Sequence, residues 1–238
     1  MPTSSNVVSV CVPYWDRQPA LDRMFEQYAR LYPELPLEFS VCDDGSPVPA
    51  VVPDGVILTR LPEKDHPLNP CVPINAAVAA SSGDIIVLTG PEIEHRSPAL
   101  PAMLALLNDE NDYVTASCWD VDRCYFIAGT EVNYRTHGRL PVPEGAHSHF
   151  LALFRRSLWE RAGGFDPAYR AGSGADDADW LWRVHRAGAR FHLADVTVYH
   201  YRGNSWWSEP HNEELFYTLW PETREGASTV PPVHVEAV

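Results

Sequence analysis

The sequence predicts an α/β fold with a central, mostly parallel sheet, and three observations support this. Short runs rich in β-branched residues alternate with segments of helical periodicity through residues 7–110. Two of these runs lead into acidic turn sequences, DDGSP and TGPEIEH. The length of 238 residues and the hydrophobic share of 45% suit one large domain. Because ligands bind at the carboxyl ends of parallel strands, both turns are expected to line one crevice.

The first half of the chain alternates strand and helix. Strands are expected over residues 7–12, 37–42, 55–61 and 84–90, and helices over 18–32, 73–83 and 97–109. One side of the first helix carries apolar residues at helical spacing, namely Leu21, Met24, Phe25, Tyr28 and Leu31. Gly83 is a stop signal for the second helix.

The second half has longer connections. Strands are expected over residues 112–119, 149–156 and 190–201, and helices over 156–164 and 176–187. The segment 123–148 reads as loop and residues from 204 onward as a tail.

The composition excludes several classes of protein. With 32 acidic and 18 basic residues, the formal charge of -14 disfavours general nucleic-acid binding. Five cysteines without a C-x-x-C pair argue against a disulfide framework or a zinc site. No signal peptide and no membrane-spanning run is found, so a soluble, cytoplasmic protein is expected.

Four motifs occur in a characteristic order: CDDGSP, INAAVAASSGDIIVLTG, RRSLWERAGGFDPAYRAGSGADDADWLWRVHRAG and VYHYRG. This order resembles the family 2 inverting glycosyltransferases of GT-A fold over residues 7–203. The resemblance implies one Rossmann-like GT-A domain over residues 1–238. Residues 7–110 would form its nucleotide-binding half, 111–203 its acceptor and catalytic half, and 204–238 a C-terminal tail.

The first motif would hold the nucleoside of the donor. Asp43 and Asp44 follow a strand, where a carboxylate can accept hydrogen bonds from a base N–H or a ribose hydroxyl. A solvated Asp-Gly turn is the alternative reading of the same residues. The resemblance adds Pro13, Tyr14 and Asn75 as nucleotide contacts.

The metal site departs from the family pattern. Thr89, Gly90 and Pro91 stand where the family carries D-x-D. The resemblance makes Glu92 and His200 the candidate ligands of Mn²⁺ or Mg²⁺, with diphosphate oxygens and water completing the site. A surface acid and a structural histidine are the alternatives.

The block GADDADW supplies the candidate catalytic carboxylates. The resemblance places Asp177 at the position of the base and Asp176 beside the acceptor sugar. Helix capping by one of these aspartates is the alternative. Asp179 is predicted to pair with Arg183 at i+4.

Aromatic and glycine residues around this block point to the acceptor. Gly174 lies on the loop that would contact it, and Trp206 and Trp207 adjoin the expected site. The glycines suggest that the loop moves over substrate. His147 and His149 would line the acceptor site or have no role, and Arg202 and Asn204 would touch phosphate.

The sequence therefore predicts transfer of a sugar from a nucleotide-diphosphate donor, expected to be a UDP-sugar, to an acceptor hydroxyl with inversion. The acceptor class stays open among carbohydrate, lipid, small molecule and modified nucleic acid, as does the oligomeric state. The alternative is a non-catalytic carbohydrate- or partner-binding module on a degenerate glycosyltransferase fold. A nucleotidyltransferase is disfavoured, because VPYWDRQPA after the first strand is neither glycine-rich nor basic.

Overall fold

The computed structural model describes residues 7–64, 69–122, 124–128, 140–172, 174–201 and 210–224. The strands are β1 (Val8–Tyr14), β2 (Leu37–Asp43), β3 (Ile57–Arg60), β4 (Ile85–Thr89), β5 (Ile93–Glu94), β6 (Asp112–Asp120), β7 (Tyr125–Ala128), β8 (Leu151–Arg155) and β9 (Arg190–His200). The helices are α1 (Gln18–Leu31), α2 (Cys71–Ala80), α3 (Leu100–Leu104), α5 (Arg156–Ala162), α6 (Asp176–Arg186) and α7 (Pro210–Leu219), with 3₁₀ turns η1 (Pro167–Ala171) and η2 (Pro221–Thr223).

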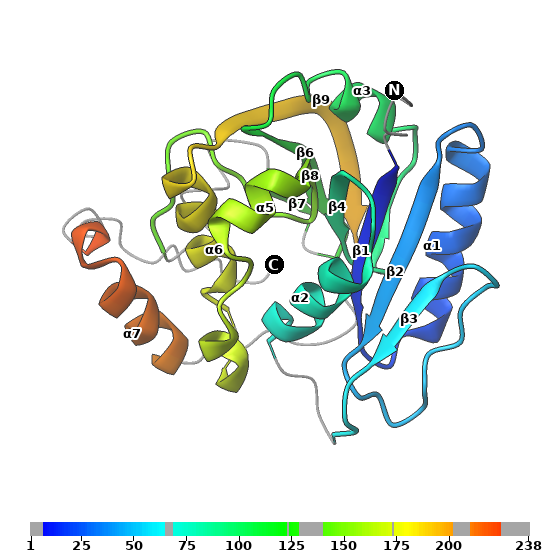
Figure 1. The fold of residues 1–238 in the computed structure, drawn as a ribbon, viewed down its shortest axis with the longest axis horizontal. Helices are drawn as coiled ribbons and strands as arrows, with labels where there is room; N and C mark the ends of the chain where they lie inside the picture. The colour runs from blue at the N-terminus through cyan, green and yellow to red at the C-terminus, as the bar shows by residue number, and fades with distance from the viewer. Residues whose placement is uncertain are drawn as a thin grey trace.

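A single sheet joins both halves of the chain (Figure 1). Its strand order is β3-β2-β1-β4-β8-β6-β9-β5, with β7 paired to β6. The strands that run in one direction are β1, β2, β3, β4, β6 and β9. The predicted α/β architecture with a mostly parallel sheet is confirmed.

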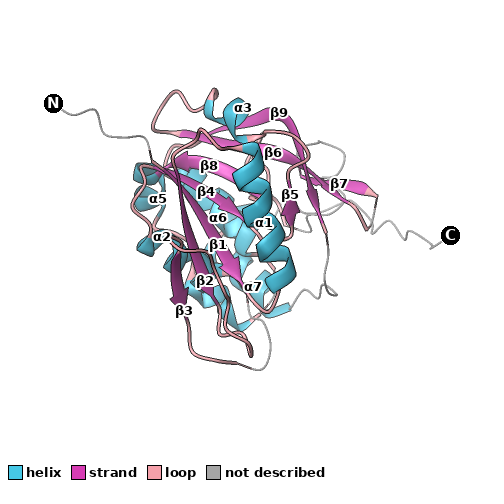
Figure 2. Ribbon diagram, turned by 90° about the vertical axis from the view of Figure 1, so that its right-hand side faces the viewer, coloured by secondary structure: helices cyan, strands magenta, loops and turns pink. Residues whose placement is uncertain are grey.

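Alternation along the strands divides the core into two layers. Val8, Val10 and Val12 of β1 face the cluster that contains the apolar side of α1, whereas Cys11 faces α2. Successive side chains of a strand point to opposite faces, so a run buried on both sides is apolar throughout. Figure 2 shows α1 on one face of the sheet, with α2, α5 and α6 behind it.

Several element boundaries differ from the expectations. The helix expected over 97–109 is confined to α3, because the Asn108 and Asp109 amides donate to Asp112 Oδ2 at 2.9 and 2.7 Å instead of continuing the helix. β7 lies inside the segment predicted as loop. The tail contains α7, whose Phe216 is fully buried.

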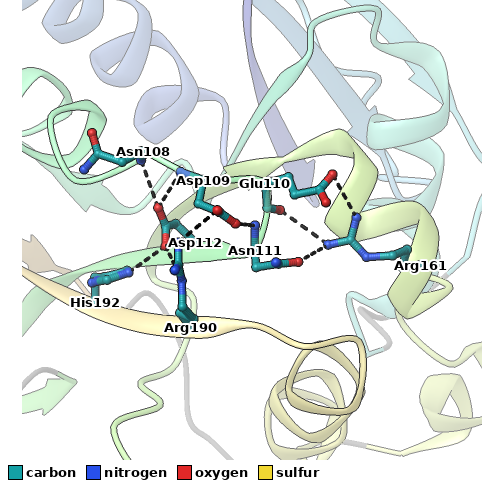
Figure 3. Close-up of polar contacts among 8 residues, drawn as sticks. All are labelled: Asn108, Asp109, Glu110, Asn111, Asp112, Arg161, Arg190 and His192. Carbon is teal, nitrogen blue, oxygen red and sulfur yellow. Dashed lines mark hydrogen bonds and ion pairs between the residues drawn. The ribbon is translucent and has the colours of Figure 1, made fainter.

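Figure 3 shows the polar network at the edge of the sheet where β6 begins. The buried Asp112 carboxylate accepts from Arg190 Nε at 3.1 Å and pairs with His192 Nε2 at 2.8 Å, besides the two amides of the preceding turn. Burial alone would raise the pKa of Asp112, but these donors outweigh it and lower the pKa. The network fixes the start of β6 against β9.

Candidate active site

The predicted site residues gather at the opposite edge of the sheet from this network. β1, β2, β4, β6 and β9 end there, and β8 begins there, since Thr89 pairs with Leu151 across the antiparallel β4–β8 ladder. The helix α6 also begins beside this edge, because Asn69, two residues before α2, donates to Oδ1 of Asp176 at the start of α6. The carboxyl ends of parallel strands are the usual ligand-binding edge of an α/β sheet.

Asp43 is fully engaged inside the protein. Its carboxylate accepts from the Ser46 amide at 2.8 Å and the Ala50 amide at 3.1 Å, and it pairs with Arg60. Burial tends to raise the pKa of Asp43, but these donors lower it overall. Asp43 therefore holds the turn that follows β2, and its contacts leave little capacity for a nucleoside.

Asp44 has a different environment. Its Oδ1 lies 2.5 Å from Nζ of Lys64, the only lysine in the sequence, and both side chains are largely buried. Burial raises the pKa of Asp44, while Lys64 and Arg170 oppose the rise. The backbone amide of Asp44 donates to the carbonyl of Tyr14 at 2.8 Å, which joins the ends of β1 and β2. Asp44 thus lies among cations, an arrangement suited to an anionic or hydroxyl-rich ligand.

The turn between these aspartates and Lys64 requires glycine. Gly45 has φ +79°, and a Cβ at this position would collide with the Pro62 carbonyl. The structure therefore gives a steric reason for the glycine of the DDGS motif.

Glu92 and His200 lie together, as the sequence hypothesis requires. Glu92 Oε1 is 3.9 Å from His200 Nε2, although Glu92 Oε2 is also 3.2 Å from Nη1 of Arg17. The other ring nitrogen of His200, Nδ1, is 3.5 Å from Oδ2 of the fully buried Asp120. An imidazole whose second nitrogen faces a carboxylate is the usual arrangement of a metal-ligating histidine.

Asp120 is a site residue that the motifs in the sequence do not indicate. Asp120-Val121-Asp122 is nevertheless a D-x-D sequence, and it lies at the end of β6 instead of after β4. Among the described residues, no group of three or more His, Cys, Asp or Glu side chains is arranged to hold a metal ion.

All three aspartates of GADDADW lie in the first turn of α6, and none caps it. The N-cap is Ala175, whose φ is +69°, and it makes no side-chain capping bond. The N-cap alternative is wrong, because Ala175 takes that position and Asp176, Asp177 and Asp179 are the first, second and fourth residues of the helix. The left-handed conformation of Ala175 costs about 1–2 kcal/mol.

The three carboxylates have separate environments. Asp176 is 4% exposed and accepts from Asn69 Nδ2 at 2.7 Å. Asp179 pairs with Arg183 at 2.5 Å, as predicted, and accepts from Trp220 Nε1 at 2.8 Å. The carboxylate of Asp177 is 35% exposed, so within this first turn it is the one open to a substrate.

Asp177 lies beside a histidine that the sequence assigned no definite role. His149 Nδ1 is 3.6 Å from Asp177 Oδ1, and burial lowers the pKa of His149 to about 4. A neutral imidazole therefore faces the carboxylate at neutral pH. Burial raises the pKa of Asp177, and burial together with the charge of Asp177 raises that of Asp176. The next residue, Phe150, contacts the ring of His200 at a centroid distance of 5.4 Å. One short segment thus joins Asp177 to the Glu92–His200 pair.

The remaining predicted contacts vary in their placement. The amide of Asn75 exchanges two hydrogen bonds with the backbone of Phe165, at 2.7 and 2.9 Å, so it clamps α2 to the loop after α5. A nucleotide contact by Asn75 would have to replace these bonds. Pro13 and Tyr14 lie at the end of β1, on the site edge.

Gly174 lies two residues before the start of α6, and its carbonyl accepts from Asn212 Nδ2 at 2.9 Å. Trp206, Trp207, Arg202 and Asn204 lie outside the described residues.

Comparison with solved structures places this architecture in the GT-A fold. A mannosyltransferase from Pyrobaculum calidifontis in complex with GDP-Man and Mn²⁺ matches with a TM-score of 0.57 and 19% identity, over 95% of this chain and 76% of the other. Residues 1–349 of S. aureus TarS in complex with UDP-GlcNAc match with a TM-score of 0.63 and 14% identity, over 89% of this chain and 64% of TarS. No protein family and no curated protein sequence matches the chain. Within the described residues, no helix has the length and apolar composition that crossing a membrane requires.

Proposed function

We propose that this protein is an inverting glycosyltransferase that transfers a sugar from a nucleotide-diphosphate donor, a UDP-sugar, to an acceptor hydroxyl. One observation carries the proposal: an accessible carboxylate, Asp177, stands at the sheet edge where Asp44 and the Glu92–His200 pair also lie. The two solved structures with this fold are glycosyltransferases in complex with nucleotide sugars, which supports the same class of donor.

Asp177 would act as the base. The acceptor oxygen attacks the anomeric carbon on the face opposite the diphosphate, the bond to the diphosphate oxygen breaks, and Asp177 takes the hydroxyl proton. Burial raises the pKa of Asp177 above that of an ordinary aspartate, which strengthens it as a base while leaving it ionised under mildly alkaline conditions. His149 would orient the carboxylate from its buried side.

The donor would bind along the ends of β1, β2 and β4. Asp44, with Lys64 and Arg170 around it, would take the nucleoside, while Asp43 keeps the turn in place. Asp176 would contact the acceptor sugar through the carboxylate oxygen that Asn69 leaves available. Gly174, Trp206 and Trp207 remain the proposed acceptor contacts.

The residues present fit a divalent cation. Glu92 Oε1 and His200 Nε2 lie 3.9 Å apart, and a carboxylate oxygen and an imidazole nitrogen are donors that Mn²⁺ accepts, so these two residues would hold the ion. Asp120 would orient His200, and the donor diphosphate would supply further oxygens. Such a cation would offset charge on the leaving diphosphate. Arg17 would have to release Glu92.

Calorimetric titration with UDP and GDP, each with and without Mn²⁺, tests the donor site. We expect micromolar UDP binding that needs Mn²⁺ and is lost in Glu92→Ala, with weaker metal-dependent binding in Asp120→Asn. Equal binding without metal would remove the cation from the proposal, and preference for GDP would correct the donor.

Sugar transfer itself is tested with Asp177→Asn. This variant should bind UDP as the wild type does but lose about 10²–10⁴-fold in turnover, the usual contribution of a general base.

The second candidate function, a non-catalytic binding module, is favoured by the T-G-P sequence in place of D-x-D. The binding module would be supported if the wild type transfers no sugar and Asp177→Asn still binds carbohydrate.

A further inference from the structure

The backbone that leads into α6 is held in an unusual conformation. Gly174 and Ala175 have consecutive positive φ values, +78° and +69°. Side-chain-bearing residues adopt this region rarely, and it persists only where the surroundings over-determine it. The turn sets the direction in which α6 starts, and therefore the position of Asp176 and Asp177.

A buried asparagine from α7 holds this turn. The amide of Asn212 donates to the carbonyl of Gly174 at 2.9 Å and to the carbonyl of Tyr169 at 3.0 Å. Asn212 is fully buried, and both contacts lie about 40 residues away along the chain. Its two donors thus join the start and the end of the loop that precedes α6.

A second asparagine holds the same turn from the other side. Asn69 donates to the Gly174 carbonyl at 3.5 Å and to Asp176 Oδ1 at 2.7 Å. Its own Oδ1 accepts from the Cys71 amide at 3.0 Å, which ties it to the start of α2. The turn is therefore fixed between α2 and α7.

The helix α7 is itself anchored to α6. Phe216 is buried, and Trp220 Nε1, just after α7, donates to Asp179 Oδ1 at 2.8 Å. Any displacement of α7 would move the group that holds the Gly174 carbonyl.

We propose that Asn212 is a positioning residue for sugar transfer, acting from the C-terminal helix through the Gly174–Ala175 turn on the Asp176–Asp177 pair. The proposal rests on the proposed function. It also revises the expectation of a freely moving loop, because loop movement would have to break both Asn212 bonds.

The test uses Asn212→Leu, which keeps the volume approximately but removes both donors without adding charge. We expect turnover to fall at least tenfold while the donor KM stays within twofold, since the donor contacts lie on other elements. The amide of Asp179 donates to the Ala175 carbonyl at 3.0 Å, and its hydrogen exchange should become at least tenfold faster. Met103→Ala, which removes a buried side chain from α3, is the control for general destabilisation and should keep both turnover and exchange of the folded protein close to wild type.

Unchanged turnover in Asn212→Leu, or an equal loss of turnover in Met103→Ala with a similarly lowered melting temperature, would overturn the positioning role. The exchange measurement needs no activity. If the wild type transfers no sugar, the proposed function fails, whereas faster exchange confined to Asn212→Leu would still establish that Asn212 holds the turn.

Discussion

Replacing Asp176 with asparagine should make the protein more stable at alkaline pH while making it a poorer enzyme. The Asp176 carboxylate is 4% exposed and lies next to Asp177 in the first turn of α6. Its hydrogen bond from Asn69 survives in Asp176→Asn, because the new side-chain oxygen can accept it. The substitution therefore removes a buried charge at nearly constant shape.

The size of the effect follows from the pKa of Asp176. Burial and the neighbouring Asp177 raise this pKa, so the folded state holds the proton more tightly than the unfolded state. The stability contributed by the protonated carboxyl is complete below about pH 4 and is lost as pH rises through the folded-state pKa. Removing a buried charge that lies beside a like charge and keeps a single side-chain hydrogen bond, from Asn69, is worth about 1–3 kcal/mol. We expect Asp176→Asn to gain about that much at pH 8 and almost nothing at pH 4.

Urea unfolding of the wild type and of Asp176→Asn at pH 4, 6 and 8 measures the gain in unfolding free energy. Titrating groups that behave alike in the two proteins contribute equally to both values and cancel. Asp195→Asn is the control, because Asp195 is exposed and should show no pH-dependent gain. Loss of stability in Asp176→Asn at pH 8, or a gain that does not grow with pH, would refute the electrostatic reasoning.

Two further predictions concern residues outside the candidate site. His95 is buried between Tyr28 and Tyr32, and burial lowers its pKa to about 4. The contribution of His95 to the unfolding free energy should therefore fall as pH drops from 6.5 toward 4, by up to about 1.4 kcal/mol per pH unit. In urea titrations, the stability of the wild type relative to His95→Gln should fall over this pH range. Asp112→Ala leaves the donors of Figure 3 without their acceptor, so the unfolding free energy should fall by about 2–4 kcal/mol. Turnover per folded molecule should stay unchanged in Asp112→Ala, since the network lies at the far edge of the sheet. A stability difference between the wild type and His95→Gln that does not change with pH would contradict the first prediction, and a loss of turnover without a loss of stability would contradict the second.

The layered architecture can be predicted from local sequence patterns. Runs buried on both faces, such as residues 85–89, contain apolar side chains at successive positions, and the apolar stripe of α1 has the period of a helix. These patterns are local, since each depends only on residues within one element. The same holds for the i,i+4 pair of Asp179 with Arg183, where helical geometry alone brings the side chains together.

The availability of each carboxylate for chemistry depends instead on packing between elements that are distant in the sequence. Asp43 and Asp44 are adjacent in sequence, yet Arg60 and two backbone amides occupy the first, while Lys64 and Arg170 surround the second. These partners come from different elements, so no local pattern indicates them.

Contacts between distant elements also surround the proposed base, the Glu92–His200 pair and the turn before α6. The approach of His149 to Asp177, of Asp120 to His200 and of Asn212 to Gly174 depends on how β8, β6 and α7 pack. A pKa responds to the burial and charge that all neighbouring elements create together. The residue types of the site were therefore readable from sequence, whereas their partners, exposure and protonation were set by contacts between residues as far as 107 positions apart.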